Sequence, residues 1–138
     1  MGNTLVQRNN KQVGTWLLIG VAMIIVQVLI GGITRLTESG LSITEWFHRL
    51  WARLLGVVFI TGFIYFLARK KFNRQMITPM IVLFFLGAMQ GLVGWLMVKS
   101  GLVPEKFYVG HVELTTHLIA AIILLAYTAW FAFGLFPA

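Results

Sequence analysis

Four long apolar stretches alternate with short polar segments along this chain of 138 residues. The stretches cover about residues 14–33, 46–68, 76–98 and 112–136. Each is long enough to cross a bilayer, which takes about 20 apolar residues in a helix. A helix also satisfies its own backbone polar groups where there is no water. The pattern predicts one all-α domain over residues 1–138, an integral membrane bundle of four antiparallel helices.

The composition supports a membrane protein over a soluble one. Hydrophobic residues make up 59% of the chain and charged residues only 11%, whereas about a quarter of a soluble domain is charged. The absence of cysteine excludes disulfides, thiolate metal sites and iron–sulfur clusters. The formal net charge of +7 fits basic loops and anionic lipid head groups. We therefore expect the lipid bilayer, and no nucleic acid, as a partner.

The basic residues predict an orientation. The polar tail over residues 1–12 and the turn over residues 69–74 hold six basic residues and no acid, while all four acids lie elsewhere. Because basic loops stay on the cytoplasmic side, both termini are predicted to be cytoplasmic. The loops over residues 34–45 and 99–110 then face outward. The first span has no convincing cleavage site and is expected to be retained.

Polar and small residues inside the spans predict local packing. Gln27 and Gln90 should each face the bundle interior and bond a neighbouring helix, because a polar group is costly in lipid. Gly87 and Gly91 have the spacing of small residues that lets two helices approach closely.

Two histidines are the main candidates for chemistry. His48 lies about one turn inside the outer end of the second span, and His117 one to two turns inside that end of the fourth. At about 1.5 Å per residue their depths match. Two imidazoles at one depth can bind a metal or a haem from opposite sides. The alternative for each is a buried imidazole bonded to a neighbouring helix, and His111 fits an interfacial role.

Small residues follow both histidines on the same helical face. They are Ala52 and Gly56 after His48, and Ala120 and Ala121 after His117. This spacing leaves room for a flat macrocycle between the helices.

Charged residues flank the first histidine. Arg49 and Arg53 are one turn apart at the outer edge, where they can bind carboxylates such as haem propionates. Glu45 shares a face with His48, so it can orient the imidazole or act as an acid or base. A di-iron carboxylate site would need glutamates that the chain lacks.

Several strings resemble the haem A synthase family of cytochrome oxidase assembly factors. GGITRLTESGLSI at residues 31–43 is similar to that family's loop after the first helix, and EWFHR at 45–49 to its Glu-x-x-His-Arg. QGLVGWLMVKSGL at 90–102 and the His117-Leu118 pair resemble its third and fourth helices. The likeness covers about residues 14–136. The first outer loop is shorter than in many members, so Glu45-Trp46 ends one string and starts the next.

The resemblance implies a function. The family oxidises a methyl group of haem O to the formyl group of haem A. His48 and His117 would be axial ligands of a haem, either b-type or the haem O substrate, and Glu45 would match the glutamate needed near the substrate. Members typically have eight spans in two halves, so a chain resembling one half would need a homo-oligomer to supply a second site. A prokaryotic plasma membrane location follows, with the site near the outer face.

Two other functions use the same histidines. One is a bis-histidine b-type cytochrome that only carries electrons, and the other is a non-catalytic haem-binding bundle. The enzyme requires Glu45, whereas an electron carrier should tolerate its replacement.

Overall fold

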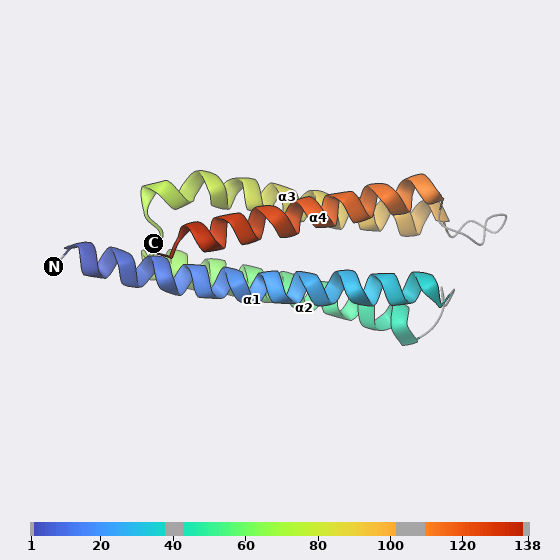
Figure 1. The fold of residues 1–138 in the computed structure, drawn as a ribbon, viewed down its shortest axis with the longest axis horizontal. Helices are drawn as coiled ribbons and strands as arrows, with labels where there is room; N and C mark the ends of the chain where they lie inside the picture. Colours follow the sequence, from blue (N-terminus) through green and yellow to red (C-terminus); the bar gives the residue numbers. More distant parts are fainter. Residues whose placement is uncertain (1, 38–42, 102–109, 137–138) are drawn as a thin grey trace.

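The computed structural model describes residues 2–37, 43–101 and 110–136. Those residues form four helices and no strand (Figure 1): α1 (Gly2–Leu36), α2 (Ile43–Ala68), α3 (Arg74–Gly101) and α4 (His111–Gly134). All four are long and apolar enough to cross a membrane. The predicted all-α, four-helix membrane fold is confirmed. Most of each predicted outer loop, residues 38–42 and 102–109, lies outside the described residues.

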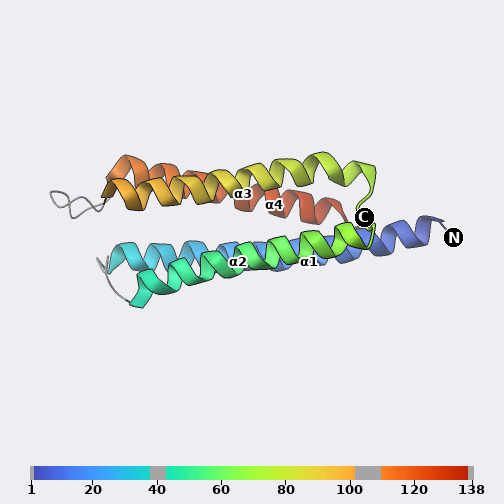
Figure 2. The same ribbon diagram turned by 180° about the vertical axis from the view of Figure 1, so that it is seen from behind.

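The helices form two antiparallel hairpins stacked in two layers, α1 with α2 and α3 with α4 (Figures 1 and 2). Contact between the layers runs through α1 and α4, and within the described helices α2 and α3 do not pack together. The order around the bundle is therefore α2, α1, α4, α3, which puts α2 and α4 on one diagonal. Both termini and the α2–α3 turn share one end (Figure 1).

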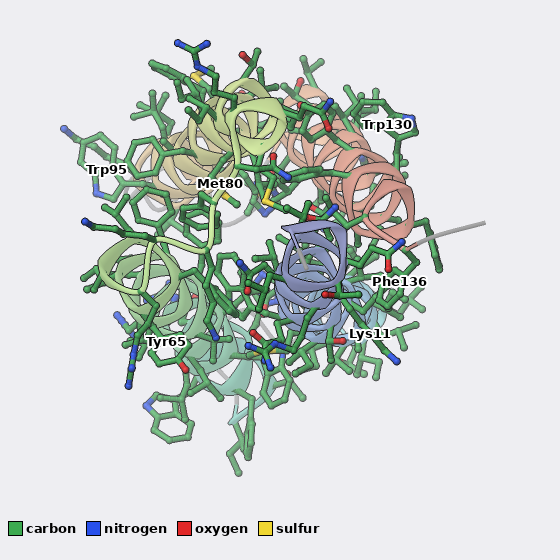
Figure 3. The ribbon with its side chains drawn as sticks, turned by 90° about the vertical axis from the view of Figure 1, so that its left-hand side faces the viewer. Lys11, Tyr65, Met80, Trp95, Trp130 and Phe136 are labelled. Carbon is green, nitrogen blue, oxygen red and sulfur yellow. The ribbon has the colours of Figure 1, made fainter. Side chains whose placement is uncertain are left out.

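The buried core occupies only the half of the bundle near the termini. Viewed along the bundle, Met80 points inward, whereas Trp95 and Trp130 project from the outside (Figure 3). The core comprises Val13, Leu17, Ile24, Phe66, Met76, Met80, Leu83, Leu124, Phe131 and Ala132. In the other half, no residue within 25–37, 43–65, 84–99 or 111–120 is buried. The two layers are thus held together at one end and less packed at the other.

The α2–α3 turn ties the core end to α1. Lys70 takes a left-handed conformation (φ 51°) at the end of α2, and the Lys71 N–H bonds the Phe66 carbonyl at 3.0 Å, a Schellman-type cap. Asn73 caps α3 by accepting a bond from the Met76 N–H at 3.0 Å. Its amide also donates to Asn10 at 3.1 Å.

Residues 1–12, expected to form a polar tail, are helical from residue 2 onward. The expectation was wrong because a polar helix is stable here when side chains tie it down. Besides the Asn73–Asn10 bond, the Lys71 ammonium donates a hydrogen bond to the side-chain oxygen Oε1 of Gln12 at 2.7 Å.

The prediction that another helix approaches closely at Gly87 and Gly91 is also wrong. A Cβ added at either position would meet no heavy atom within 4 Å. Gly87 lies three and seven residues before Gln90 and Gly94, hence on the same side of α3. Gln90 and Gly94 on that side contact His117 of α4, whereas no heavy atom of the described residues lies within 4 Å of a Cβ at Gly87.

Trp16 of α1 packs against α2. The Trp16 indole N–H donates to the Val58 carbonyl at 3.2 Å, and its ring stacks on Phe59 with centroids 5.6 Å apart. The same indole lies directly against Gly62, where a Cβ would collide with it. Gly62 is therefore required by the approach of a rigid ring.

Gly62→Ala should lower the free energy of unfolding by about 1–3 kcal/mol, because the indole must shift from a packed position. Gly20→Ala is the matched control, since a Cβ there meets nothing within 4 Å. It should be neutral or slightly stabilising, because alanine favours helix more than glycine does. Unfolding in detergent measures both, and equal effects would contradict the role given to Gly62.

Candidate functional site

His48 lies five residues after the start of α2 and is backed by a side chain from α1. The Gln27 amide nitrogen donates to the His48 backbone carbonyl at 3.1 Å. It also lies 3.2 Å from Nδ1 and 3.1 Å from Nε2 of the ring. A nitrogen equally near both cannot lie in the ring plane without overlapping ring atoms, so the amide packs over the face of the imidazole. The in-plane directions of both ring nitrogens stay open to another partner.

A glycine one turn further along α1 completes the contact. A Cβ on Gly31 would lie 2.9 Å from Cε1 of His48, closer than real Cβ contacts. The ring therefore approaches the α1 backbone to a distance that only glycine allows. We call the glutamine and the glycine four residues after it the imidazole seat.

The second hairpin repeats this seat. The Gln90 amide nitrogen donates to the His117 carbonyl at 3.3 Å and lies 3.4 and 3.5 Å from the two ring nitrogens. A Cβ on Gly94 would lie 2.9 Å from Cε1 of His117. Each hairpin thus holds one histidine against a Gln-x-x-x-Gly segment of the preceding helix.

These contacts confirm that both glutamines face inward and bond a neighbouring helix. They also leave the buried Oε1 atoms of Gln27 and Gln90 without a hydrogen-bond partner. A buried acceptor without a partner destabilises a protein by about 1–3 kcal/mol. Two such acceptors at equivalent positions indicate that the imidazole seats are kept for a functional site, although they lower the stability of the protein.

The two imidazoles lie at the same end of diagonal helices. His48 follows the first residue of α2 by five positions and His117 that of α4 by six, a depth difference of about 1.5 Å. Both lie in the half of the bundle where the described residues form no buried core.

This geometry suits a metal whose other ligands come from a bound cofactor and not from the protein. No group of three or more His, Cys, Asp or Glu residues within the described ranges could hold a bare ion. Two imidazoles at similar depth on diagonal helices can supply two ligands from opposite sides, as a haem requires. Gly56, two turns after His48, also meets nothing within 4 Å of a Cβ position, which leaves room beside the ring.

The charged residues of α2 lie before and after His48 in the first part of the helix. The Glu45 carboxylate accepts a hydrogen bond from Arg49 Nη2, and their side chains are 21% and 43% exposed. Glu45 is thus paired with Arg49, and no hydrogen bond joins it to His48 in the described structure. Arg53, one turn beyond Arg49, is exposed.

The corresponding acid on α4 lies apart from its histidine. Glu113 is exposed, and its carboxylate folds back against Gly110 at the start of the helix. His111 is exposed at the first position of α4.

Sequence reasoning missed Gly31 and Gly94 and did not name the partners of the glutamines. The signal was present as a repeat, because Gln27-x-x-x-Gly31 and Gln90-x-x-x-Gly94 occupy equivalent places before the two histidines.

Comparison with known proteins gives a consistent picture. The model of a cytochrome oxidase assembly protein family, COX15-CtaA, matches residues 14–47 and 43–138. Similar curated proteins are the heme A synthases of Flavobacterium psychrophilum (36% identity; 93% of this chain, 52% of that protein), Flavobacterium johnsoniae (36%; 94% and 52%) and Nitrosomonas eutropha (34%; 93% and 49%). The chain spans about half the length of these relatives. No solved structure matches.

The family match also locates a difference from the relatives. Residues 43–47 belong to both segments that the family model matches. The alignment with the heme A synthase of Flavobacterium psychrophilum runs over 178 positions, which is more than the 138 residues of this chain. The relatives therefore carry a segment that is absent here, and the break in the match falls at Glu45. This glutamate matches two places in the family.

Gln27→Met and Gln90→Met should leave the haem-free protein as stable as the parent, or more stable. Each change loses one hydrogen bond, worth about 0.5–1.5 kcal/mol, but removes a buried acceptor that costs about 1–3 kcal/mol. Unfolding in detergent measures the effect, with Gln75→Met at an exposed position as the control. A loss above ~2 kcal/mol would show that the glutamines are structural ties.

Proposed function

We propose a function for this chain on the premise that it belongs to the COX15-CtaA family of cytochrome oxidase assembly proteins, as the match over most of its length shows. The chain acts as a haem A synthase-like membrane oxidoreductase that oxidises a methyl group of haem O towards the formyl group of haem A. The observation that carries this proposal is the pair of imidazole seats.

His48 and His117 are the axial ligands of a haem held between the two layers. Bound haem iron supplies the redox chemistry, and the haem is b-type or the haem O substrate. The proposal rests on the open ring nitrogens, the diagonal helices and the absence of buried residues in the described part of this half. The two orphaned glutamine oxygens are further polar groups that a bound ligand or its water can satisfy.

Gln27 and Gln90 are positioning residues for the two ligands. Each amide packs over an imidazole while its N–H is bonded to the histidine backbone. The ring is thereby confined between the amide and a glycine, which limits its rotation and keeps one nitrogen directed into the bundle. A group confined in this way loses less freedom when it binds.

Arg49 and Arg53 bind the propionates, and Glu45 holds or moves a proton beside the substrate. The arginines are one turn apart on the exposed side of α2, where carboxylates can meet both. Glu45 is part-buried, and its ion pair with Arg49 orients it.

A second copy of the chain, or a partner chain, supplies a second haem site. The proposal is supported by coverage, since the match spans 52% of the heme A synthase of Flavobacterium psychrophilum. Symmetric association of two copies is the simplest way to reproduce two equivalent halves.

The protein lies in a prokaryotic plasma membrane with both termini in the cytoplasm. Six basic residues lie in the first twelve residues and the α2–α3 turn, and these segments share one end of the bundle. The positive-inside rule then directs the histidine end outward.

The purified protein should show a six-coordinate, low-spin haem spectrum that is lost in His48→Ala and in His117→Ala. Each change removes one axial ligand, and added imidazole should restore the spectrum by occupying the vacated position. His111→Ala is the control and should keep the spectrum, since that residue is exposed at the start of α4. Retention of the parent spectrum in both ligand variants would refute the assignment.

Glu45→Gln should keep the haem spectrum but stop product formation. The measurement is mass spectrometry of pigments extracted after co-expression with a haem O source, with Glu113→Gln as the control. The parent should accumulate hydroxylated or formyl haem, and Glu45→Gln should retain haem O. If the parent also holds only unmodified haem, the chain is a b-type electron carrier or a non-catalytic haem-binding bundle.

A further inference from the structure

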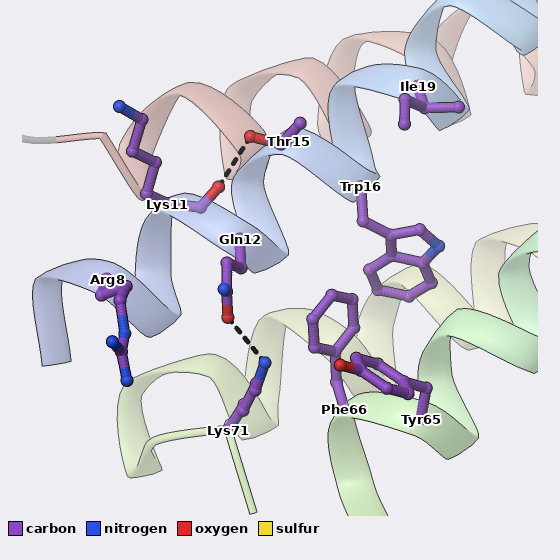
Figure 4. Close-up of a pocket in the computed structure, with 9 residues that line it drawn as sticks. All are labelled: Arg8, Lys11, Gln12, Thr15, Trp16, Ile19, Tyr65, Phe66 and Lys71. Atoms are coloured by element: carbon purple, nitrogen blue, oxygen red, sulfur yellow. Dashed lines mark hydrogen bonds between the residues drawn. The ribbon is translucent and has the colours of Figure 1, made fainter. Parts of the chain in front are cut away.

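A basic groove lies at the opposite end of the bundle from the histidines (Figure 4). It has a volume of about 570 Å³ and lies between α1 and the end of α2. Three of its lining residues are cations: Arg8 and Lys11 from α1, and Lys71 from the turn after α2. Figure 4 shows Arg8 extending from α1 towards that turn and Lys71 rising from the turn towards α1.

Lys71 is held in place by the fold. Its ammonium donates to Gln12 at 2.7 Å and lies 5.2 Å from the centre of the Tyr65 ring and 5.7 Å from that of Phe66. Lys70, which precedes Lys71, takes a left-handed conformation, although that conformation is unfavourable for a residue other than glycine. The cation is therefore positioned before any ligand arrives.

No acidic side chain among the described residues lies near the groove. All four acids of the chain are at positions 38, 45, 105 and 113. Glu45 and Glu113 belong to the first turns of α2 and α4, at the far end of the bundle. Arg8, Lys11 and Lys71 give the lining of the groove a positive charge, which an anion would neutralise.

The other side of the groove is apolar. Trp16 and Ile19 line it next to Phe66, and Ile19 is 52% exposed on a helix that crosses the membrane. A ligand that fills this groove therefore has an anionic head and an apolar tail. A free phosphate ion would use only the basic part.

We propose that this groove binds an anionic phospholipid of the bilayer. Its phosphate lies between Arg8 and Lys71, and its acyl chain runs along Trp16 and Ile19. The lipid joins α1 to the α2–α3 turn and reinforces the tie made by Lys71 and Gln12. Such a site is separate from the haem site, since it lies in the half of the bundle that carries the packed core.

Native mass spectrometry and thermal unfolding of the whole chain in neutral detergent test this site. The probes are phosphatidylglycerol, phosphatidylcholine with the same acyl chains, and inorganic phosphate. Phosphatidylglycerol should stay bound and raise Tm, whereas the other two should do neither. A triple variant, Arg8→Gln with Lys11→Gln and Lys71→Gln, should weaken this binding at least about tenfold, because each basic group contributes about 1 kcal/mol.

The matched control is Lys70→Gln with Arg74→Gln, compared with Arg8→Gln with Lys11→Gln, because it removes the same charge at the same end from residues that do not line the groove. Arg69 is kept, since its guanidinium lies 5.7 Å from the centre of the Tyr65 ring. The control should bind the lipid within about twofold of the parent. Equal losses in both double variants would mean general surface attraction and overturn the site. So would equal retention of phosphatidylcholine, or an equal rise in Tm with inorganic phosphate. If the groove triple unfolds, Arg8→Gln with Lys11→Gln keeps the Lys71–Gln12 bond and is held to the same criteria.

Discussion

The close approach of an imidazole to a glycine, under a glutamine amide, occurs once in each hairpin and shapes the functional half of this protein. In a bilayer interior a polar side chain must find its partner within the protein. Here the glutamine meets the backbone carbonyl and the ring face of the histidine. Both ring nitrogens consequently remain open in the ring plane. A more conventional side-chain hydrogen bond would have used one of them.

The distribution of packing follows from the same arrangement. The buried residues join the hairpins through α1 and α4 near the termini, where the α2–α3 turn is tied to α1 by Asn73 and Lys71. At the histidine end the described residues form no such core. Because the packed core near the termini stabilises the bundle, the two layers can pack less closely at the histidine end while the fold is kept. The unsatisfied glutamine oxygens agree with a region kept for a ligand.

The charges are divided between the two ends as well. Cations concentrate around the turn and the first helix, and the described acids lie in the first turns of α2 and α4. At the turn, cations lie over aromatic rings and line a groove. At the other end an ion pair joins Glu45 to Arg49 next to His48. The end that carries the α2–α3 turn is thus suited to contact the lipid surface, and the end that carries His48 and His117 is suited to chemistry.

The sequence by itself determined the number of helices, their membrane character and the similar depth of His48 and His117 in their helices. These properties depend on the length and periodicity of apolar runs and on helix rise, which are local. The family relationship was also readable, because strings such as residues 90–102 carry it without reference to the fold. The inward direction of Gln27 and Gln90 followed from the cost of a polar group in lipid.

Only the tertiary structure decided which atoms these residues meet. It paired each glutamine with a histidine 21 or 27 residues away, made Gly31 and Gly94 the close-approach positions in place of Gly87 and Gly91, and joined Glu45 to Arg49. It also extended α1 through the polar residues 2–12, because Gln12 and Asn10 find partners on the α2–α3 turn. Such contacts depend on the relative rotation and separation of whole helices, which packing between distant segments sets and no local pattern contains.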